Sequence, residues 1–251
     1  MSGSHLSEIR ITSVLQSFTS GFVDTLGFVA LFGLFTAHVT GNFVLVGASV
    51  ANGHPGVVGK LLALPMFVIG VAGTRAYLLA LERRQRALAV PVVAVELFLL
   101  LAFMLAGIWA QPFDSADGWP TIAVGMLGVA TMAVQNTASR LTFSHLGPTT
   151  VMTGNVTQLV IDLVDLLSGA AAPGTLERIY KTWPAVIAFA VGAIGGGLGY
   201  RLTGFWSLLV PMGVLGSTLL QRTTYQRTSP TEAENKRKPV TFRVGAGRGR
   251  H

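Results

Sequence analysis

The sequence predicts an all-α membrane protein with about six transmembrane helices, arranged as two inverted three-helix repeats. Three observations support this class: an apolar composition, several long segments almost free of charge, and a short phrase that occurs twice. Of the 251 residues, 51% are hydrophobic and 12% are charged, and this charged share is about half that of a typical soluble domain. We therefore expect the chain to lie in a bilayer.

Six segments are long enough and apolar enough to be transmembrane helices. A helix needs about 20 mostly apolar residues to cross the roughly 30 Å hydrocarbon layer. The first segment contains one charged residue, Asp24, and the third contains only Glu96. The expected spans are residues 12–36, 57–81, 89–110, 119–141, 182–202 and 204–221. Together they predict a single transmembrane domain over residues 1–221.

Residues 222–251 differ from the rest of the chain because they are basic and poor in apolar residues. Eight of the 18 basic residues lie in these last 30 positions, and the formal charge of the whole chain is +7. A basic segment directly after a span is typical of one that rests on anionic lipid headgroups at the cytoplasmic surface. We expect a disordered cytoplasmic tail that contacts membrane lipids and no nucleic acid, and a cytoplasmic N-terminus.

The repeated phrase is Thr-Gly-Asn, and each copy is followed by a short apolar run. The copies occupy residues 40–42 and 153–155, and the runs after them cover residues 43–51 and 156–167. Such runs are too short to span a bilayer, so we expect helices that are either re-entrant or interfacial. The copies divide the domain into repeats of about 12–110 and 119–221. Because each repeat has three spans, the second copy must be inverted relative to the first.

Two helix starts of this kind predict a binding site between the repeats. Gly permits a tight turn, and Thr and Asn are good N-cap residues. The free N–H groups of a helix start attract anionic or carbonyl groups. The alternative is that each motif is only a capped turn. The candidate residues are Thr40, Gly41 and Asn42 in the first copy, and Thr153, Gly154 and Asn155 in the second.

Polar residues inside or beside the apolar spans extend this candidate site. Asp24 lies near the middle of the first predicted span, where a carboxylate is costly and is by default functional. It could carry a proton or bind a cation, or it could be a structural hydrogen-bonder between helices. Gln135 and Asn136 occupy the matching place in the second repeat. His38, just before the first motif, is either part of the site or an interfacial hydrogen-bonder.

Arg75 and Glu96 are expected to form a structural ion pair. They lie at similar distances from the predicted hairpin turn near residue 85, so their depths in two antiparallel helices should match. A gating role or a contact with a substrate carboxylate is the alternative interpretation of this pair.

The residues that most enzyme and metal sites need are not arranged in a recognisable pattern. The chain has no cysteine, and no His and carboxylate cluster has the spacing of metal ligands. We therefore expect no metal, no cofactor and no enzymatic activity. Glycines in residues 182–202 suit close helix packing, either within one chain or between two copies, which leaves a homo-oligomer open.

Several phrases resemble those of the YoaK-like family of bacterial inner-membrane proteins, a domain of unknown function. The phrases cover residues 21–24, 36–42 and 149–158, and the resemblance extends over roughly residues 10–220. It implies a multi-pass protein of the bacterial inner membrane with about six spans, and it implies no substrate. The basic tail is a departure from the family pattern.

The sequence therefore predicts a small-solute secondary transporter or permease, with its site between the two Thr-Gly-Asn helix starts. The alternative is a non-transporting membrane scaffold or sensor whose basic tail recruits a partner or anionic lipid. The two differ in whether Asp24 and the motifs face a shared polar cavity.

Overall fold

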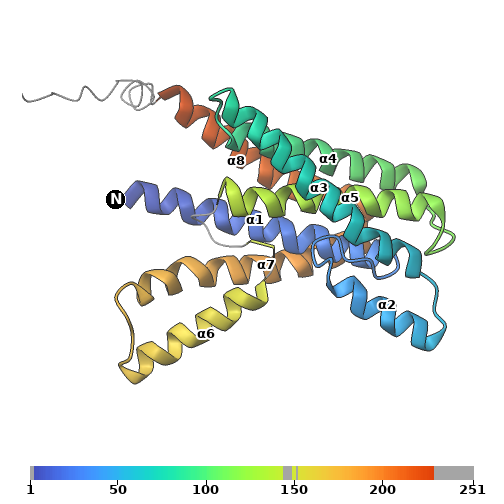
Figure 1. Ribbon diagram of the computed structural model, residues 1–251, viewed down its shortest axis with the longest axis horizontal. Coiled ribbons are helices and arrows are strands. Elements are labelled where there is room, and N and C mark those ends of the chain that lie inside the picture. The colour runs from blue at the N-terminus through green and yellow to red at the C-terminus, as the bar shows by residue number, and fades with distance from the viewer. Residues whose placement is uncertain (1–2, 144–148, 151, 229–251) are drawn as a thin grey trace, which may run out of the picture.

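The computed structural model describes residues 3–143, 149–150 and 152–228, and over this part of the chain the protein is helical with no strand. The remaining residues of the predicted basic tail lie outside the described part. The elements are α1 (Gly3–Ala30), α2 (Gly41–Asn52), α3 (Val57–Arg83), α4 (Ala89–Ala110), α5 (Trp119–Leu141), α6 (Met152–Ser168), α7 (Thr175–Thr203), the 3₁₀ helix η2 (Gly204–Leu208) and α8 (Leu209–Thr228). Figure 1 shows them as one bundle, from which α2 and α6 project.

Four stretches of the described chain are long and apolar enough to cross a membrane: Val57–Arg83, Ala89–Ala110, Trp119–Leu141 and Thr175–Leu220. The first three match predicted spans closely. The fourth covers the predicted fifth span and all but the last residue of the sixth. Within it η2 separates α7 from α8, and these two helices run in opposite directions (Figure 1). The all-helical membrane class is thus confirmed, whereas the count of six spans stays a prediction.

The ends of the first and last helices differ from expectation. The predicted first span ran to residue 36, but α1 ends at Ala30, because Phe32 and Gly33 adopt left-handed backbone angles that no helix can continue. At the other end, α8 continues to Thr228 and so enters the predicted basic tail.

The polar helices lie inside the bundle and the apolar ones lie outside. Of the 18 most apolar consecutive residues of α5, 83% are buried inside the protein, against 22% for α3 and 33% for α4. α1 has the hydroxyl and amide side chains expected of an interior helix, with Thr12, Ser13, Gln16 and Ser17 all buried. The outer helices present side chains such as Phe98 (69% exposed) to the surroundings. This distribution suits a protein whose solvent is lipid.

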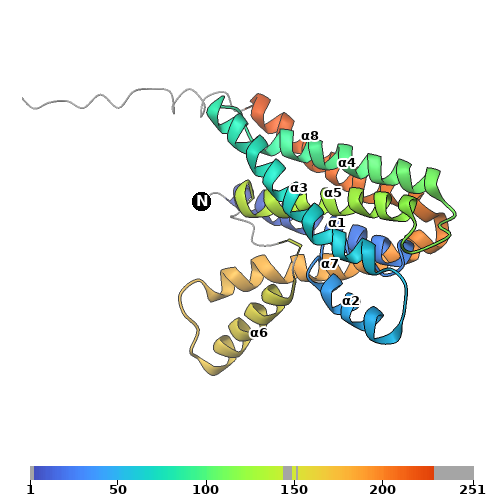
Figure 2. The ribbon, with the colours of Figure 1, turned by 45° about the vertical axis from the view of Figure 1, so that its right-hand side comes forward.

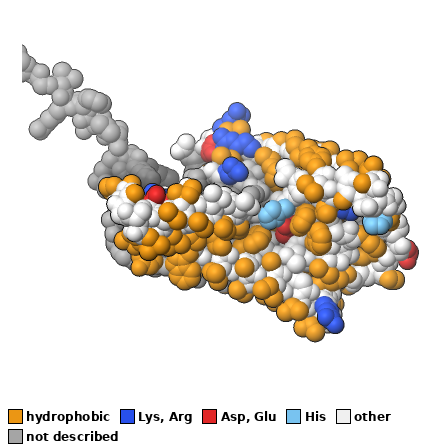
Figure 3. Space-filling view, turned by 90° about the horizontal axis from the view of Figure 1, so that it is seen from below, with side chains coloured by type: hydrophobic (Ala, Val, Ile, Leu, Met, Phe, Trp, Pro, Cys, Tyr) orange, Lys and Arg blue, Asp and Glu red, His pale blue; other side chains and the backbone are white. Residues whose placement is uncertain are grey.

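The face viewed in Figure 3 illustrates the same point, because hydrophobic and uncharged side chains cover most of it. Two tryptophans, Trp109 and Trp119, are strongly exposed near the α4–α5 connection. Aromatic side chains of this kind are typical of a membrane–water interface.

The bundle is held together by two main helix pairs, α1 with α7 and α5 with α3. Glycines bring the first pair into backbone contact: a Cβ at Gly192 or Gly196 would overlap the carbonyl oxygens of Phe18 and Phe22. Gly21 lies in the same way against Phe189. The predicted glycine packing is therefore found inside one chain, and such close approach is a main source of helix association in lipid.

The short helices α2 and α6 start near the middle of the molecule and diverge toward its opposite ends (Figures 1 and 2). The N-terminal end of α1, the α3–α4 connection and the C-terminal end of α8 share one end of the bundle. The α4–α5 connection and the turn between α7 and α8 lie at the other end (Figure 2), where Gln111 Nε2 donates to the Tyr200 hydroxyl.

Candidate functional site

The segment between α1 and α2, residues 31–40, is non-helical and consists of turns and irregular backbone. α1 ends when the N–H of Gly33 donates to the carbonyl of Phe28 at 2.9 Å. Phe32 (φ 52°) and Gly33 (φ 79°) then turn the chain. The segment folds back along the last turns of α1, so residues that are far apart in sequence come into contact.

Asp24 holds this segment in place. Its Oδ1 accepts hydrogen bonds from the backbone N–H groups of Thr36 (2.8 Å) and Ala37 (2.6 Å) and from the Thr36 hydroxyl (3.2 Å). The side chain is buried. These donors replace the water that the carboxylate has lost, which is the condition for burying a charge in a membrane protein.

The second oxygen of Asp24 pairs with His38, whose Nδ1 lies 2.6 Å from Oδ2. The His38 side chain is 32% exposed, and its ring packs against Phe35 and against Phe189 of α7 at centroid distances of 5.9 and 5.8 Å. A carboxylate that binds one ring nitrogen fixes the orientation and tautomer of an imidazole. The arrangement leaves Nε2 to bind a polar group that reaches this half-buried position.

Asn42 fixes the other side of the segment. Its Oδ1 accepts from the N–H of Phe35 and its Nδ2 donates to the carbonyl of Phe35, both at 2.9 Å, and Asn42 is fully buried. The side chain therefore acts as a clamp on the preceding loop. Sequence reasoning assigned Asn42 to the site but did not find this partner.

The predicted capping by Thr40 is wrong. Thr40 precedes α2 in helical conformation and its side chain makes no capping hydrogen bond. The first N–H groups of α2, on Gly41, Asn42 and Phe43, donate to the carbonyls three residues before them at 2.8–3.2 Å. The start of α2 is thus closed by its own backbone, because the chain enters the helix through a tight turn.

The second motif starts α6 but makes different local contacts. Val151, which precedes it, lies outside the described residues, while Thr153 and Gly154 are exposed in the first turn. Asn155 is half-buried, and its Nδ2 donates to Met152 Sδ at 3.4 Å. The two copies therefore share a position at the start of a short helix, and the asparagine is fully buried in the first copy and half-buried in the second.

Gln135 and Asn136 are both buried in α5. Gln135 Nε2 donates to the backbone carbonyl of Gln16 on α1 at 2.6 Å, which joins the first helices of the two halves. No hydrogen bond recorded for the described part of the chain connects either residue to Asp24, so the structure does not bring these three candidates into one cluster.

The predicted ion pair between Arg75 and Glu96 is wrong. Arg75 pairs instead with Glu82, two turns further along α3, at 2.9 Å, and both side chains are 41% exposed. Glu96 is completely buried in α4. Matching the depths of two helical residues says nothing about which way each faces, and these two face in different directions.

Sequence reasoning missed two polar contacts that fix the start of α3. Lys60 is buried, and its Nζ donates to the carbonyls of Phe32 (3.1 Å) and Gly56 (3.0 Å). Asp117 accepts from the N–H groups of Gly56 (2.7 Å) and Val58 (3.0 Å). A lone lysine at the start of an apolar span was the available signal. Lys60 also ties α3 to the segment that Asp24 holds.

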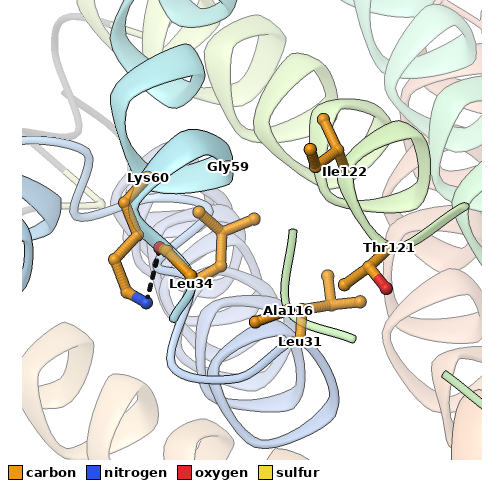
Figure 4. A pocket seen from close by; sticks show the side chains of 8 residues that line it. Leu31, Leu34, Gly59, Lys60, Ala116, Thr121 and Ile122 are labelled. Carbon is orange, nitrogen blue, oxygen red and sulfur yellow. Dashed lines mark hydrogen bonds between the residues drawn. The ribbon is translucent and has the colours of Figure 1, made fainter. Parts of the chain in front are cut away.

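A small cavity lies beside Lys60, lined mainly by Leu31, Leu34, Gly59, Thr121 and Ile122 (Figure 4). Its volume is about 10 Å³, which is room for about one water molecule. It is therefore too small for a solute.

A third contact that the sequence did not reveal joins α6 to α7. Asp162 accepts from Arg178 Nη2 at 2.7 Å and from Arg178 Nε at 3.0 Å. The guanidinium lowers the pKa of the Asp162 carboxyl below its ordinary value of 3.8, against the opposing effect of its burial. Within the described residues no group of three His, Asp or Glu side chains gathers as metal ligands would.

The fold and these contacts define a helical membrane protein with a polar helix break inside its bundle. The chain belongs to the family described as "Protein of unknown function (DUF1275)", which matches residues 12–220. It is also similar to the UPF0700 transmembrane protein YoaK of Bacillus subtilis (strain 168), at 29% identity over 184 residues, which cover 72% of this chain and 79% of that protein. No solved structure matches the chain. The predicted YoaK-like membership is thus confirmed.

Proposed function

We propose that the protein is a secondary transporter or permease for a small polar solute, with its site at the break between α1 and α2. The observation that carries the proposal is the pair formed by Asp24, which is buried in α1, and the half-buried His38 of the non-helical segment inside the bundle. Irregular backbone at membrane depth persists where it lines a binding cavity or is buried in protein. Transporters place their substrate and ion sites at such breaks.

Two inverted repeats would explain the order of the helices. In this view α1, α2, α3 and α4 correspond to α5, α6, α7 and α8. The main contacts agree with it, since α1 packs on α7 while its counterpart α5 packs on α3. The short helices also agree, because each starts near the middle of the molecule and runs to the opposite end from the other (Figures 1 and 2).

Within this proposal, the candidate residues have separate tasks. His38 binds the solute through Nε2, and Asp24 orients it. Asn42, with Thr40 and Gly41, sets the position of α2 relative to that histidine. Thr153, Gly154 and Asn155 bring the start of α6 toward the same central region, and Gln135 and Asn136 hold α5 against α1 behind it.

The distribution of charge supports an inner-membrane location with both termini in the cytoplasm. Arg83, Arg84 and Arg86 in the α3–α4 connection share one end of the bundle with the N-terminal end of α1 and the C-terminal end of α8. Arginine and lysine collect on the cytoplasmic side of membrane proteins. Trp109 and Trp119 lie toward the other end.

The test is solute flux in proteoliposomes, screened across sugars, amino acids, organic acids and amines, with and without a proton gradient. His38→Gln should abolish the flux, and His54→Gln, which changes an exposed histidine beyond α2, should leave it unchanged. Folded protein that moves none of these solutes would overturn the proposal and favour a non-transporting scaffold or sensor. Equal flux in the two variants would remove His38 from the site.

A further inference from the structure

Glu96 places a carboxyl group in the interior of the bundle, and this group lacks hydrogen-bond partners. It lies in the middle of α4, and its side chain is 0% exposed. Neither Oε1 nor Oε2 has a hydrogen-bond partner. Buried polar groups are nearly always satisfied, so an exception requires an explanation.

Two glutamines of the interior helices connect to Glu96 and also have atoms without a hydrogen-bond partner: Gln16 lies beside Glu96, and Gln135 is bound to Gln16. The Gln16 amide of α1 lies beside the carboxyl, and its Nε2 has no acceptor. Gln135 of α5 is bound to the backbone of Gln16 through Nε2, while its Oε1 has no donor. Glu96, Gln16 and Gln135, which we name the interior cluster, therefore combine a free donor with free acceptors.

Among the side chains that the structure describes, no cation pairs with Glu96. The acidic side chain that the structure describes on α1 is that of Asp24, and it is already paired with His38. On α5 the charged residue is Arg140, which is exposed near the end of the helix. Glu96 is the sole titratable residue of α4, and residues 204–220 of η2 and α8 contain none.

These observations favour a neutral Glu96. An ionised carboxylate here would be a buried charge with the neutral Gln16 amide beside it and no counter-ion, and an unpaired buried charge is among the most costly arrangements in a protein. A protonated carboxyl carries no charge, and its second oxygen can still accept from the Gln16 amide beside it. One bound proton thus removes the uncompensated charge from the interior of the bundle.

We propose that Glu96 is a proton-binding site of the bundle interior, which takes up one proton on a carboxylate oxygen and releases it to water when the bundle opens. On α1, the helix that carries Gln16, the hydroxyls of Ser17 and Ser20 are likewise buried and have no partner. Within the described residues no metal-like group of ligands gathers, and a proton requires none. The site is separate from the Asp24–His38 pair and does not depend on which solute the protein moves.

The test measures protonation directly, in the full-length protein in lipid nanodiscs. Infrared difference spectra recorded from about pH 5 to about pH 10 should show a protonated carboxyl band that disappears as the pH rises. Glu96→Gln should lack the band, and Glu82→Gln, which removes an exposed carboxylate, should keep it. A hydrophobic carbodiimide, which modifies protonated carboxyls in apolar surroundings, should label Glu96 and not Glu82 in the same sample.

Each other outcome overturns the proposal. An ionised Glu96 at every pH excludes a protonated site, and a band that never titrates makes Glu96 a permanently neutral structural group. Loss of the band on adding Na⁺ at constant pH would identify a metal ion as the occupant. Thermal unfolding of Glu96→Gln, expected to match the unmodified protein, confirms that a missing band does not come from misfolding. None of these measurements uses flux, so they are decided independently of the transport assay.

Discussion

Two regions of α1 bury polar groups, and they do so in opposite ways. Near the end of the helix, Asp24 has a partner for each oxygen and fixes residues 31–40. Further toward the N-terminus, Gln16 lies in the interior cluster, where Glu96 has a partner for neither oxygen. The difference shows that burial alone does not define the state of a carboxyl group. The first region supplies protein partners to both carboxyl oxygens, whereas the second leaves both without a partner and is suited to a change of protonation.

The backbone around each region explains this difference. Asp24 faces a non-helical segment, and such a segment has N–H groups to donate. Glu96 lies between helices, whose N–H groups are already used in their own ladders. A carboxyl group between helices can therefore find hydrogen-bond partners only among side chains, or can bind a proton. Single substitutions in each region test this contrast.

The largest effect is expected from Asp24→Ala. The change leaves the N–H groups of Thr36 and Ala37 buried without an acceptor, so it should cost about 3–5 kcal/mol in unfolding free energy. Denaturant unfolding in detergent micelles measures this cost. Asp114→Asn, at an exposed acid, is the matched control and should change little. A small loss in Asp24→Ala would mean that the segment is held mainly by Asn42 and Lys60.

The next effect should come from Gly192→Leu, since both regions depend on the position of α1. Leucine would overlap the backbone of Phe18 and push α1 from α7, at a cost of about 1–3 kcal/mol. Gly73→Leu, where a Cβ meets nothing within 4 Å, should be nearly neutral. The same unfolding measurement compares the two variants, and equal losses would contradict the close packing of α1 on α7.

The two copies of the motif provide a smaller contrast. Asn42→Ala removes two hydrogen bonds to Phe35 from a fully buried position and should cost about 1–2 kcal/mol. Asn155→Ala changes a half-buried side chain and should cost less. Hydrogen exchange of residues 31–40 should accelerate in the first variant alone. If both variants are equally destabilised, the motifs have the same structural role after all.

The smallest effect is a pH dependence in the second half, at Asp162. Because Arg178 lowers the pKa of Asp162, this pair contributes stability above the ordinary pKa of 3.8, and the contribution is lost as the pH falls through the lower folded value. Protease cleavage of the α6–α7 connection, followed from about pH 7 to about pH 3, should increase at the acid end. Asp162→Asn should lack this increase and Glu177→Gln should retain it. An unchanged acid response in Asp162→Asn would assign it to another group.

Hydropathy predicted well where most helices begin and end. It did not predict which neighbouring helix each side chain contacts. The spans at 57–81, 89–110 and 119–141 agree with α3, α4 and α5 within a few residues. The short runs after the two motifs became α2 and α6. Arg75 and Glu96 show the limit, because equal depth in a hairpin does not establish that two side chains meet. Which side of a helix contacts its neighbours depends on the helices that pack against it, and a single sequence does not reveal these partners.

For the site, the sequence identified the residues and missed their contacts. Asp24 and His38 were both candidates, yet their pairing required the chain to turn at Phe32, a residue that rarely adopts the left-handed conformation seen here. Without that turn, the first span would continue to residue 36 and the pair could not form. Lys60 shows the same limit, since its acceptors are backbone carbonyls, which have no sequence signal.

The pairing of α1 with α7 has a consequence for how the protein is made. The main packing partner of α1 is α7, which begins only at Thr175. Synthesis proceeds from the N-terminus, so α1 leaves the ribosome long before the glycines that will receive it. The close contact of α1 with α7 can therefore form only after Gly192 and Gly196 have been synthesised, when most of the chain has already been translated.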